Sequence, residues 1–318
     1  MSLFRSIRES PAPDVAVEIA ANRVSAATLE WRGGRPVVAG YSIDPLPDGT
    51  LVPSLTALNT NNRATVAGTL ARALERLGRP RRIGLVIPDA VAKVSLVRFE
   101  KVPPRAQDLD QLIRWQVRKS APFPIEEAQV TYVPGLASAD GHEFVVALSR
   151  RSVIEEYEAL CADAGAHAGV VDISTFNVIN AVLAGSESPS ADWLLVNVAA
   201  DSASIAILRD EHVIFFRNRA AEAEGTLIDL VHQSAMYYED RLKGAGFTHI
   251  FLGGAGTGAV EQVRRELEAR LGTSVSTIDP RAAAALTDRI AAAPALLDTL
   301  APLVGLMLRD SRPSTVNS

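Results

Sequence analysis

The fold is decided by the stretch Trp193-Leu-Leu-Val-Asn-Val-Ala-Ala-Asp-Ser-Ala-Ser-Ile-Ala-Ile-Leu208, which continues through Arg209-Asp-Glu-His-Val-Ile-Phe-Phe216. It contains two apolar runs joined by the small-residue turn 199–202, then a polar turn and a third apolar run. Short apolar runs bounded by turn residues predict three consecutive strands. The same pattern stands 179 positions earlier, with Val17 in the place of Val196. A recurring three-stranded meander predicts two related lobes.

The earlier copy begins with Val17-Glu-Ile-Ala-Ala-Asn22 and continues with apolar runs over 24–29 and 36–43, separated by the turn Arg32-Gly-Gly-Arg35. A helix is predicted over 62–77, because its apolar residues fall on one face and Asn61 or Asn62 can cap it. The apolar run Arg82-Ile-Gly-Leu-Val-Ile87 predicts a buried strand. Meander, helix and strand together predict one α/β lobe.

An inserted block follows, in which strand, helix, two strands and helix are predicted in turn over residues 91–167. After it, a strand and a helix over 168–186 return to the first lobe, which therefore comprises 14–90 and 168–186. The second lobe is expected over 191–311. Its predicted elements after the meander are a helix over 222–243, a strand over 248–252, a helix over 259–271, a strand over 274–278 and a helical tail over 280–309, broken at Pro294 and near Pro302. Residues 1–13 and 312–318 are expected to be flexible.

Composition excludes several classes of protein. The chain has 318 residues, of which 47% are hydrophobic and 22% charged, as in an ordinary folded protein. Its net charge of −5 indicates no basic face, so we expect no nucleic-acid partner. Cys161 is the single cysteine, which excludes an intrachain disulfide and a thiol metal cluster. No apolar run is long enough to span a membrane and no secretory signal is present, so a cytoplasmic location is predicted.

The two small-residue turns are the first candidate site. Facing hairpins with small tips could hold nucleotide phosphates through main-chain amides, and an acidic residue before a tip could hold Mg²⁺. Only Glu18 meets that condition, because Asn197 stands at the matching position of the second copy. Ala20 and Ala199 occupy tip positions where glycine would allow the closest approach. The alternative is two core hairpins with small turns.

A second candidate is the glycine-rich stretch Gly253-Gly-Ala-Gly-Thr-Gly258 between a predicted strand and a predicted helix. Its backbone N–H groups could face a ligand near the helix N-terminus. The alternative is a tight turn that needs positive φ angles. Glu222 and Glu224 fall at the predicted start of the 222–243 helix, where the helix dipole explains them.

Several segments resemble the PilM family of type IV pilus assembly, in the FtsA/PilM branch of the actin-like ATPase superfamily. The resemblance extends over residues 14–309 and implies an α/β, two-lobed actin-like (ribonuclease H-like) fold with duplicated β-meander lobes and an inserted α+β subdomain of the 1C type. The segments that carry it are Ile113-Arg-Trp-Gln-Val-Arg-Lys-Ser-Ala-Pro-Phe-Pro-Ile-Glu-Glu127, Val171-Asp-Ile-Ser-Thr-Phe-Asn-Val-Ile-Asn-Ala181, Ser234-Ala-Met-Tyr-Tyr-Glu239, Ile250-Phe-Leu-Gly-Gly254 and Ala301-Pro-Leu-Val-Gly-Leu-Met-Leu-Arg309.

The resemblance also implies a site for ATP and Mg²⁺ at the two turns, with Glu18 as the metal contact. The sequence departs from the family pattern, because Glu18-Ile-Ala20 replaces Asp-Ile-Gly and Asn197-Val-Ala199 replaces an acidic-x-Gly turn. We therefore expect nucleotide binding to be weak or lost and predict no catalytic residue. The implied nucleotide-binding residues are Glu18, Ala20, Ala21, Asn22 and Arg23 in the first loop, Asn197, Ala199, Ala200, Asp201 and Ser202 in the second, and Gly253, Gly254 and Gly256 in the adenosine turn.

The function that the resemblance implies is that of an adaptor in the inner-membrane platform of the pilus. Such a protein would bind the N-terminal cytoplasmic peptide of a PilN-like membrane protein and so lie peripherally at the inner membrane. The expected groove is in the first lobe beside the inserted subdomain and involves 91–132. Self-association is a further expectation. The alternatives are an active actin-like ATPase or kinase-like enzyme and an FtsA-like filament former, although 310–318 lacks the amphipathic helix that would anchor such a filament.

Overall fold

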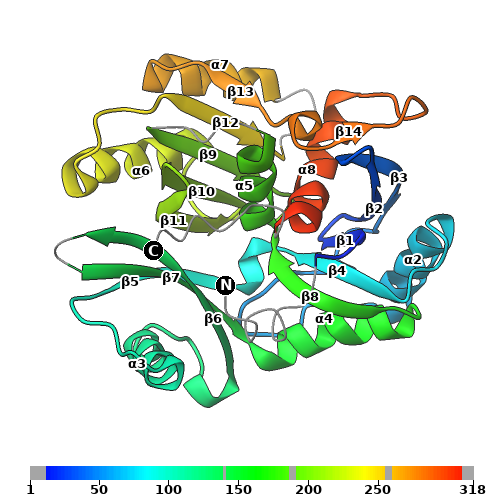
Figure 1. The fold of residues 1–318 in the computed structure, drawn as a ribbon, viewed down its shortest axis with the longest axis horizontal. Helices are drawn as coiled ribbons and strands as arrows, with labels where there is room; N and C mark the ends of the chain where they lie inside the picture. Colours follow the sequence, from blue (N-terminus) through cyan, green and yellow to red (C-terminus); the bar gives the residue numbers. More distant parts are fainter. Residues whose placement is uncertain (1–11, 139–140, 186–190, 255–259, 310–318) are drawn as a thin grey trace.

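The computed structural model describes residues 12–138, 141–185, 191–254 and 260–309, which form two large sheets and one small one (Figure 1). The first lobe has a six-stranded sheet of order β14-β3-β2-β1-β4-β8, and the second lobe has a five-stranded sheet of order β11-β10-β9-β12-β13. The inserted subdomain has a three-stranded sheet of order β5-β7-β6. The predicted α/β fold with two lobes and an insert is confirmed.

The first lobe begins with the expected meander, in which β1 (Val15–Ala20), β2 (Arg23–Arg32) and β3 (Arg35–Pro45) pair antiparallel. β4 (Arg82–Ile87) joins β1 in parallel, and β8 (His167–Ile173) joins β4 in parallel as an outermost strand of the sheet.

The second lobe repeats this arrangement. β9 (Asp192–Val198), β10 (Ser202–Arg209) and β11 (His212–Ala220) form the second antiparallel meander, and β12 (His249–Gly253) joins β9 in parallel, as β4 joins β1. β13 (Val275–Thr277) then extends the sheet. The recurrence seen in the sequence is therefore a duplication of topology.

Helices cover both faces of the first sheet. α2 (Arg63–Arg76) and α4 (Arg151–Asp163) pack on one face, where Leu70 and Tyr157 join Ile19 in a buried cluster. The Asn62 side chain caps α2, as its sequence predicts. α5 (Ser174–Gly185) and α8 (Pro294–Leu308) lie between the two large sheets (Figure 1).

The inserted subdomain is β5 (Lys93–Phe99), α3 (Ala106–Arg118), β6 (Ala128–Ser138) and β7 (Gly141–Arg150), with the short helix η2 (Ile125–Glu127) before β6. α3 covers one face of its sheet, where Ile113 and Val117 pack with Phe144, Val146 and Leu148. The opposite face of β6 and β7 turns toward the first lobe, which places a groove between them.

Among the residues described, the second lobe has the helices α6 (Leu227–Leu242) and α7 (Val260–Leu271). The prediction of a helix from residue 222 is wrong, because α6 begins at Leu227 behind a capping box made by Thr226 and Asp229. Gly225, with a φ of +90°, turns the chain just before this cap. Glu222 and Glu224 therefore precede the helix and do not belong to its first turn.

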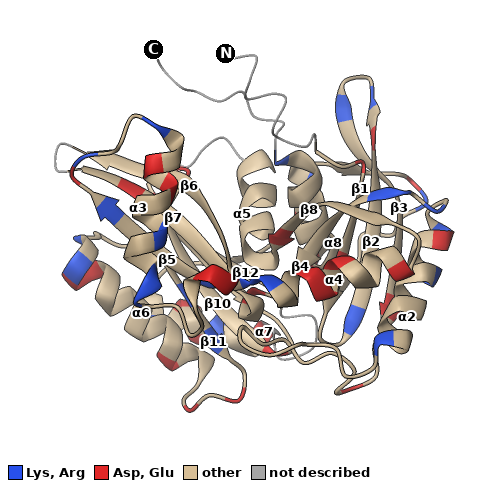
Figure 2. Ribbon diagram, turned by 90° about the horizontal axis from the view of Figure 1, so that it is seen from below, with Lys and Arg blue, Asp and Glu red and all other residues tan. Residues whose placement is uncertain are grey.

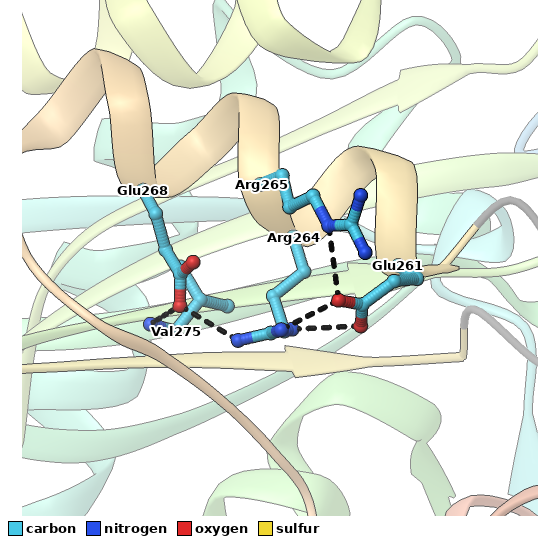
Figure 3. A network of polar contacts seen from close by, with 5 residues as sticks. All are labelled: Glu261, Arg264, Arg265, Glu268 and Val275. Carbon is cyan, nitrogen blue, oxygen red and sulfur yellow. Dashed lines mark hydrogen bonds and ion pairs between the residues drawn. The ribbon is translucent and has the colours of Figure 1, made fainter.

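A polar network on α7 ties this helix to β13 (Figure 3). Arg264 binds Glu261 on one side and Glu268 on the other, and Glu268 also accepts a 3.0 Å hydrogen bond from the Val275 N–H. The neighbouring guanidinium of Arg264 lowers the pKa of Glu261 to about 2. The network fixes α7 over the edge of the second sheet.

The C-terminal part of the chain belongs to the first lobe, so the assignment of all of 191–311 to the second lobe is wrong. After the short helix η3 (Pro280–Ala282), β14 (Ala285–Leu286) pairs with β3, and α8 packs on β1, β2 and β4. The prediction of a break near Pro302 is also wrong, because α8 continues through this buried proline. Its leucines at 296, 300, 303 and 306 bury enough apolar surface to outweigh the missing N–H bond.

Candidate functional site

A cleft of about 270 Å³ lies where the tips of the two meanders meet. Its wall brings together most of the predicted nucleotide-binding residues, which come from both lobes. Ala21, Ser202 and Gly253 do not line it, and Gly256 lies outside the described residues. The predicted residues that line the cleft are Glu18, Ala20, Asn22 and Arg23 from the first turn, Asn197, Ala199, Ala200 and Asp201 from the second, and Gly254.

Glu18, the predicted metal contact, is buried and fully engaged by the protein itself. Its Oε2 accepts hydrogen bonds of 2.8 Å from Arg23 Nη2 and 3.2 Å from Ser25 Oγ. Its Oε1 accepts a 3.1 Å bond from Ser174 Oγ, at the start of α5. The guanidinium of Arg23 is thus the cation beside Glu18.

Gly254, at the predicted adenosine turn, is also engaged. Its N–H donates a 2.6 Å hydrogen bond to Asp298 Oδ1 on α8. The turn presses against the second loop, because a Cβ at Gly254 would lie 1.6 Å from the Val198 carbonyl oxygen. This position requires glycine for two reasons: the close approach of the Val198 carbonyl and a φ of +75°.

Asp89 is the centre of a buried network that the sequence analysis missed. It lies in the short helix η1 (Asp89–Val91) after β4, and its carboxylate accepts hydrogen bonds from the N–H and hydroxyl of Thr175 and from Ser204 Oγ at 2.6 Å. Asn197 Nδ2 donates to Thr175 Oγ1 at 2.9 Å, and Asn218 Nδ2 donates to Ser204 Oγ at 2.9 Å. Since Ser204 and both asparagines belong to the second sheet, the network joins the lobes. A lone aspartate after a Pro at a strand end was the only available signal.

Electrostatically, the cleft is acidic. Burial raises the pKa of Asp89, Asp201 and Asp298, so their charged forms are less favourable here than in water. Arg23 is the single cation that lines the cleft within the described ranges. Across those same ranges no group of three histidine, cysteine or acidic residues is arranged to hold a metal ion.

These contacts do not fit a Mg²⁺–nucleotide. The carboxylate expected to hold the metal is occupied by Arg23 and two serines, and the amide of the adenosine turn is occupied by Asp298. Asn197 contributes no charge and instead donates to Thr175. A polyphosphate would meet acidic side chains from both lobes, which repel it.

A larger concavity of about 370 Å³ lies between the first lobe and the insert. One wall is β8 with α4, and the other is the face of β6 and β7 that α3 leaves uncovered; Figure 1 shows these elements side by side. β8 is an outermost strand of its sheet, and so is β6. The groove therefore offers strand edges as well as small and apolar side chains, notably Ala147, Ala168 and Ile154.

Comparison with known proteins gives the chain its family. The sequence model described as "Type IV pilus assembly protein PilM" matches residues 16–240. Among solved structures, the "PilM-PilN type IV pilus biogenesis complex" is similar with a TM-score of 0.80 at 18% identity, over 95% of this chain and 100% of that one. A Bacteroides thetaiotaomicron protein with an actin-like ATPase fold and unknown function has a TM-score of 0.52 at 10% identity, over 96% and 98%.

These likenesses agree with the duplicated meanders and the insert. Within the described ranges, no helix has the length and apolar character needed to cross a bilayer. The family match covers well over half of the chain, and the structure of the PilM–PilN complex matches 95% of it. The chain therefore belongs to the type IV pilus assembly protein PilM family and has its actin-like fold.

Proposed function

We propose that this protein is a cytoplasmic adaptor of the type IV pilus inner-membrane platform, which binds the N-terminal cytoplasmic peptide of a PilN-like membrane protein and does not turn over nucleotide. Its place at the membrane would then come from the partner. The observation that carries the proposal is the 370 Å³ groove between the edge of β8 and the inserted sheet, in a chain whose fold matches that of a PilM–PilN complex.

The groove suits an extended peptide. A peptide that adds to the free edge of β8 gains main-chain hydrogen bonds, and its alternate side chains fill pockets on either side. Small side chains at Ala147 and Ala168 leave room for such a strand, and Ile154 and Val171 offer apolar contacts. The groove overlaps the expected region 91–132 only at Ala92, Gln129 and Thr131, and its remaining wall comes from β7, α4, β8 and the end of β4.

The contacts within the cleft support the proposal that the protein does not turn over nucleotide. Glu18 and the Gly254 amide already have intramolecular partners, and Ala20 and Ala199 place a Cβ at the tips. A protein that used ATP would need these groups free. The Asp89 network already joins the two lobes through side-chain hydrogen bonds, which supports the proposal.

Titration of a fluorescein-labelled PilN-type N-terminal peptide tests the proposal. We expect saturable binding that Ala147→Trp, which fills the groove, weakens at least about tenfold, a change of about 1.4 kcal/mol. Gln116→Trp on the exposed face of α3 is the matched control and should bind normally. Mg-ATP turnover is measured on the same protein. Turnover that disappears in Glu18→Gln would favour the ATPase alternative and overturn the adaptor proposal.

A further inference from the structure

Two carboxylates of the groove have no ion-pair partner within the part of the chain that the structure describes: Glu155 and Glu158, which lie on α4 one turn apart and therefore on one face. A third, Asp172 on β8, accepts a 2.8 Å hydrogen bond from the Ile173 N–H and has Arg309 nearby. Two other acids of α4 are already engaged: Glu156 accepts hydrogen bonds from the Asn59 and Thr60 N–H groups, and Asp163 binds Arg63. Of the described acids on α4, the two that face the groove are thus the ones without an ion-pair partner.

The groove provides little positive charge to balance them. Arg151 is the one cationic residue on its described wall, where Arg151 Nη2 donates to the Ala128 carbonyl at 3.4 Å, and Arg309 lies near Asp172. Figure 2 shows acidic segments along α4. An occupant that brings its own cations would complement this wall, whereas a neutral or acidic peptide would desolvate the carboxylates without compensation.

The carboxylates lie on both sides of the β8 edge. Val171 and Ile173 pack on the α2/α4 face of the first sheet, and Val170 packs on the α8 face. Because side chains alternate along a strand, Asp172 points to the α8 face, opposite Glu155 and Glu158. A strand added to β8 would also alternate, so it could present one basic side chain to each side.

From this arrangement we infer that the groove selects an extended peptide with basic residues on both of its faces, one lysine or arginine meeting Glu155 and Glu158 and another meeting Asp172. This inference rests on the proposed function, because it specifies the chemistry of the peptide that the groove would take. Apolar contacts and main-chain pairing provide general affinity, and the carboxylates provide selectivity between peptides.

The experiment compares the fluorescein-labelled PilN-type peptide with a version in which every Lys and Arg is replaced by Gln. We expect the Gln version to bind at least about tenfold more weakly to the wild-type protein, and this difference to shrink as salt is raised. The variant Glu155→Gln/Glu158→Gln should weaken binding of the basic peptide about three- to tenfold and leave the Gln peptide unchanged. Asp172→Asn should act additively, because it lies on the other face.

Glu239→Gln, an exposed acid on α6 remote from the groove, is the charge-matched control and should change neither affinity. Thermal melts establish that all variants are folded, which the exposure of Glu155 and Glu158 favours. Equal affinities of the basic and Gln peptides for the wild-type protein would overturn this inference and leave the adaptor function standing. Absence of binding by both peptides would overturn the adaptor function itself.

Discussion

Arg23 Nη2 lies 2.8 Å from Glu18 Oε2, so the first turn of the cleft holds its own cation beside the carboxylate expected to bind Mg²⁺. Both residues come from the same hairpin, at the end of β1 and the start of β2. The Glu18 side chain is 5% exposed and that of Arg23 is 30% exposed. Such a pair stabilises mainly by preventing an uncompensated buried charge.

Removing this cation is therefore expected to destabilise the protein. Arg23→Ala leaves Glu18 with two serine donors and no counter-charge, and we expect a loss of about 1–3 kcal/mol in the free energy of unfolding. Urea denaturation measures the loss. Arg32→Ala, which breaks the exposed pair with Glu30, is the control and should cost less than about 0.5 kcal/mol. Equal losses in the two variants would show that Glu18 does not need Arg23.

Placing an acid at position 197 in the second loop should also lower the free energy of unfolding. Asn197→Asp replaces the Nδ2 donor to Thr175 with a carboxylate close to the buried Asp89. We expect a loss of about 1–3 kcal/mol at neutral pH, because a donor disappears and a like charge is added. Ala199→Gly, at the exposed tip of the same turn, is the control and should change stability little. A stable Asn197→Asp variant that binds Mg-ATP would contradict this account of the cleft.

Glycine at 254 is required by close packing of the two loops. Gly254→Ala would place its Cβ 1.6 Å from the Val198 carbonyl oxygen, so β9 and the turn must separate. We expect a loss of at least about 3 kcal/mol, as in other severe overpacking. Gly49→Ala separates backbone strain from packing, because Gly49 has a similar φ of +70° and no atom within 4 Å. It should cost only about 1–2 kcal/mol, and a similar loss in both variants would exclude the packing explanation.

Asp172 should make stability depend on pH in an unusual direction. Burial raises its pKa from 3.8 to about 6, although the nearby Arg309 acts in the opposite sense and Asp89 in the same sense. The folded state then binds this proton more tightly than the unfolded state. The contribution of Asp172 to the free energy of unfolding therefore falls as pH rises from about 4 to about 6. Asp172→Asn should therefore raise stability at neutral pH by about 1–2 kcal/mol, less than the full shift implies, because the side chain is partly open to the groove.

The gain in Asp172→Asn should vanish below about pH 4, where the wild-type carboxyl is protonated in both states. Asp163→Asn should instead lower stability at neutral pH, because Arg63 lowers the pKa of Asp163 and the substitution removes this ion pair. Denaturation curves across this pH range measure both effects. If the stability of Asp172→Asn followed that of the wild type at every pH, Asp172 would not be the perturbed group.

The sequence was informative where local pattern determines structure. The two meanders, α2 with its Asn62 cap and β4 follow from periodicity and turn residues, and the structure confirms them. The pairing of β14 with β3 and the packing of α8 on the first lobe could not be read this way, because an apolar helix fits either lobe equally well by composition.

The site was predicted only in part for the same reason. Glu18 and Asn197 were found from the duplication and Gly254 from the glycine-rich stretch, and all three line one cleft, but their role in binding stays a prediction. The Gly254–Asp298 contact and the Asp89 network join residues that are far apart in the sequence. Glu18 and Arg23 are close in the sequence, but such charged residues could lie either on the surface or in the core. No local pattern specifies which donor a buried carboxylate will find.

The return of α8 to the first sheet affects how the chain can be made. A chain synthesised from its N-terminus completes β1, β2 and β4 early, yet the apolar face formed by Ala16, Leu29 and Val86 is covered mainly by α8, the last helix described. Until α8 leaves the ribosome, the first lobe exposes an apolar surface that favours aggregation. Premature stop codons anywhere before α8 should therefore yield insoluble polypeptide instead of a smaller working protein.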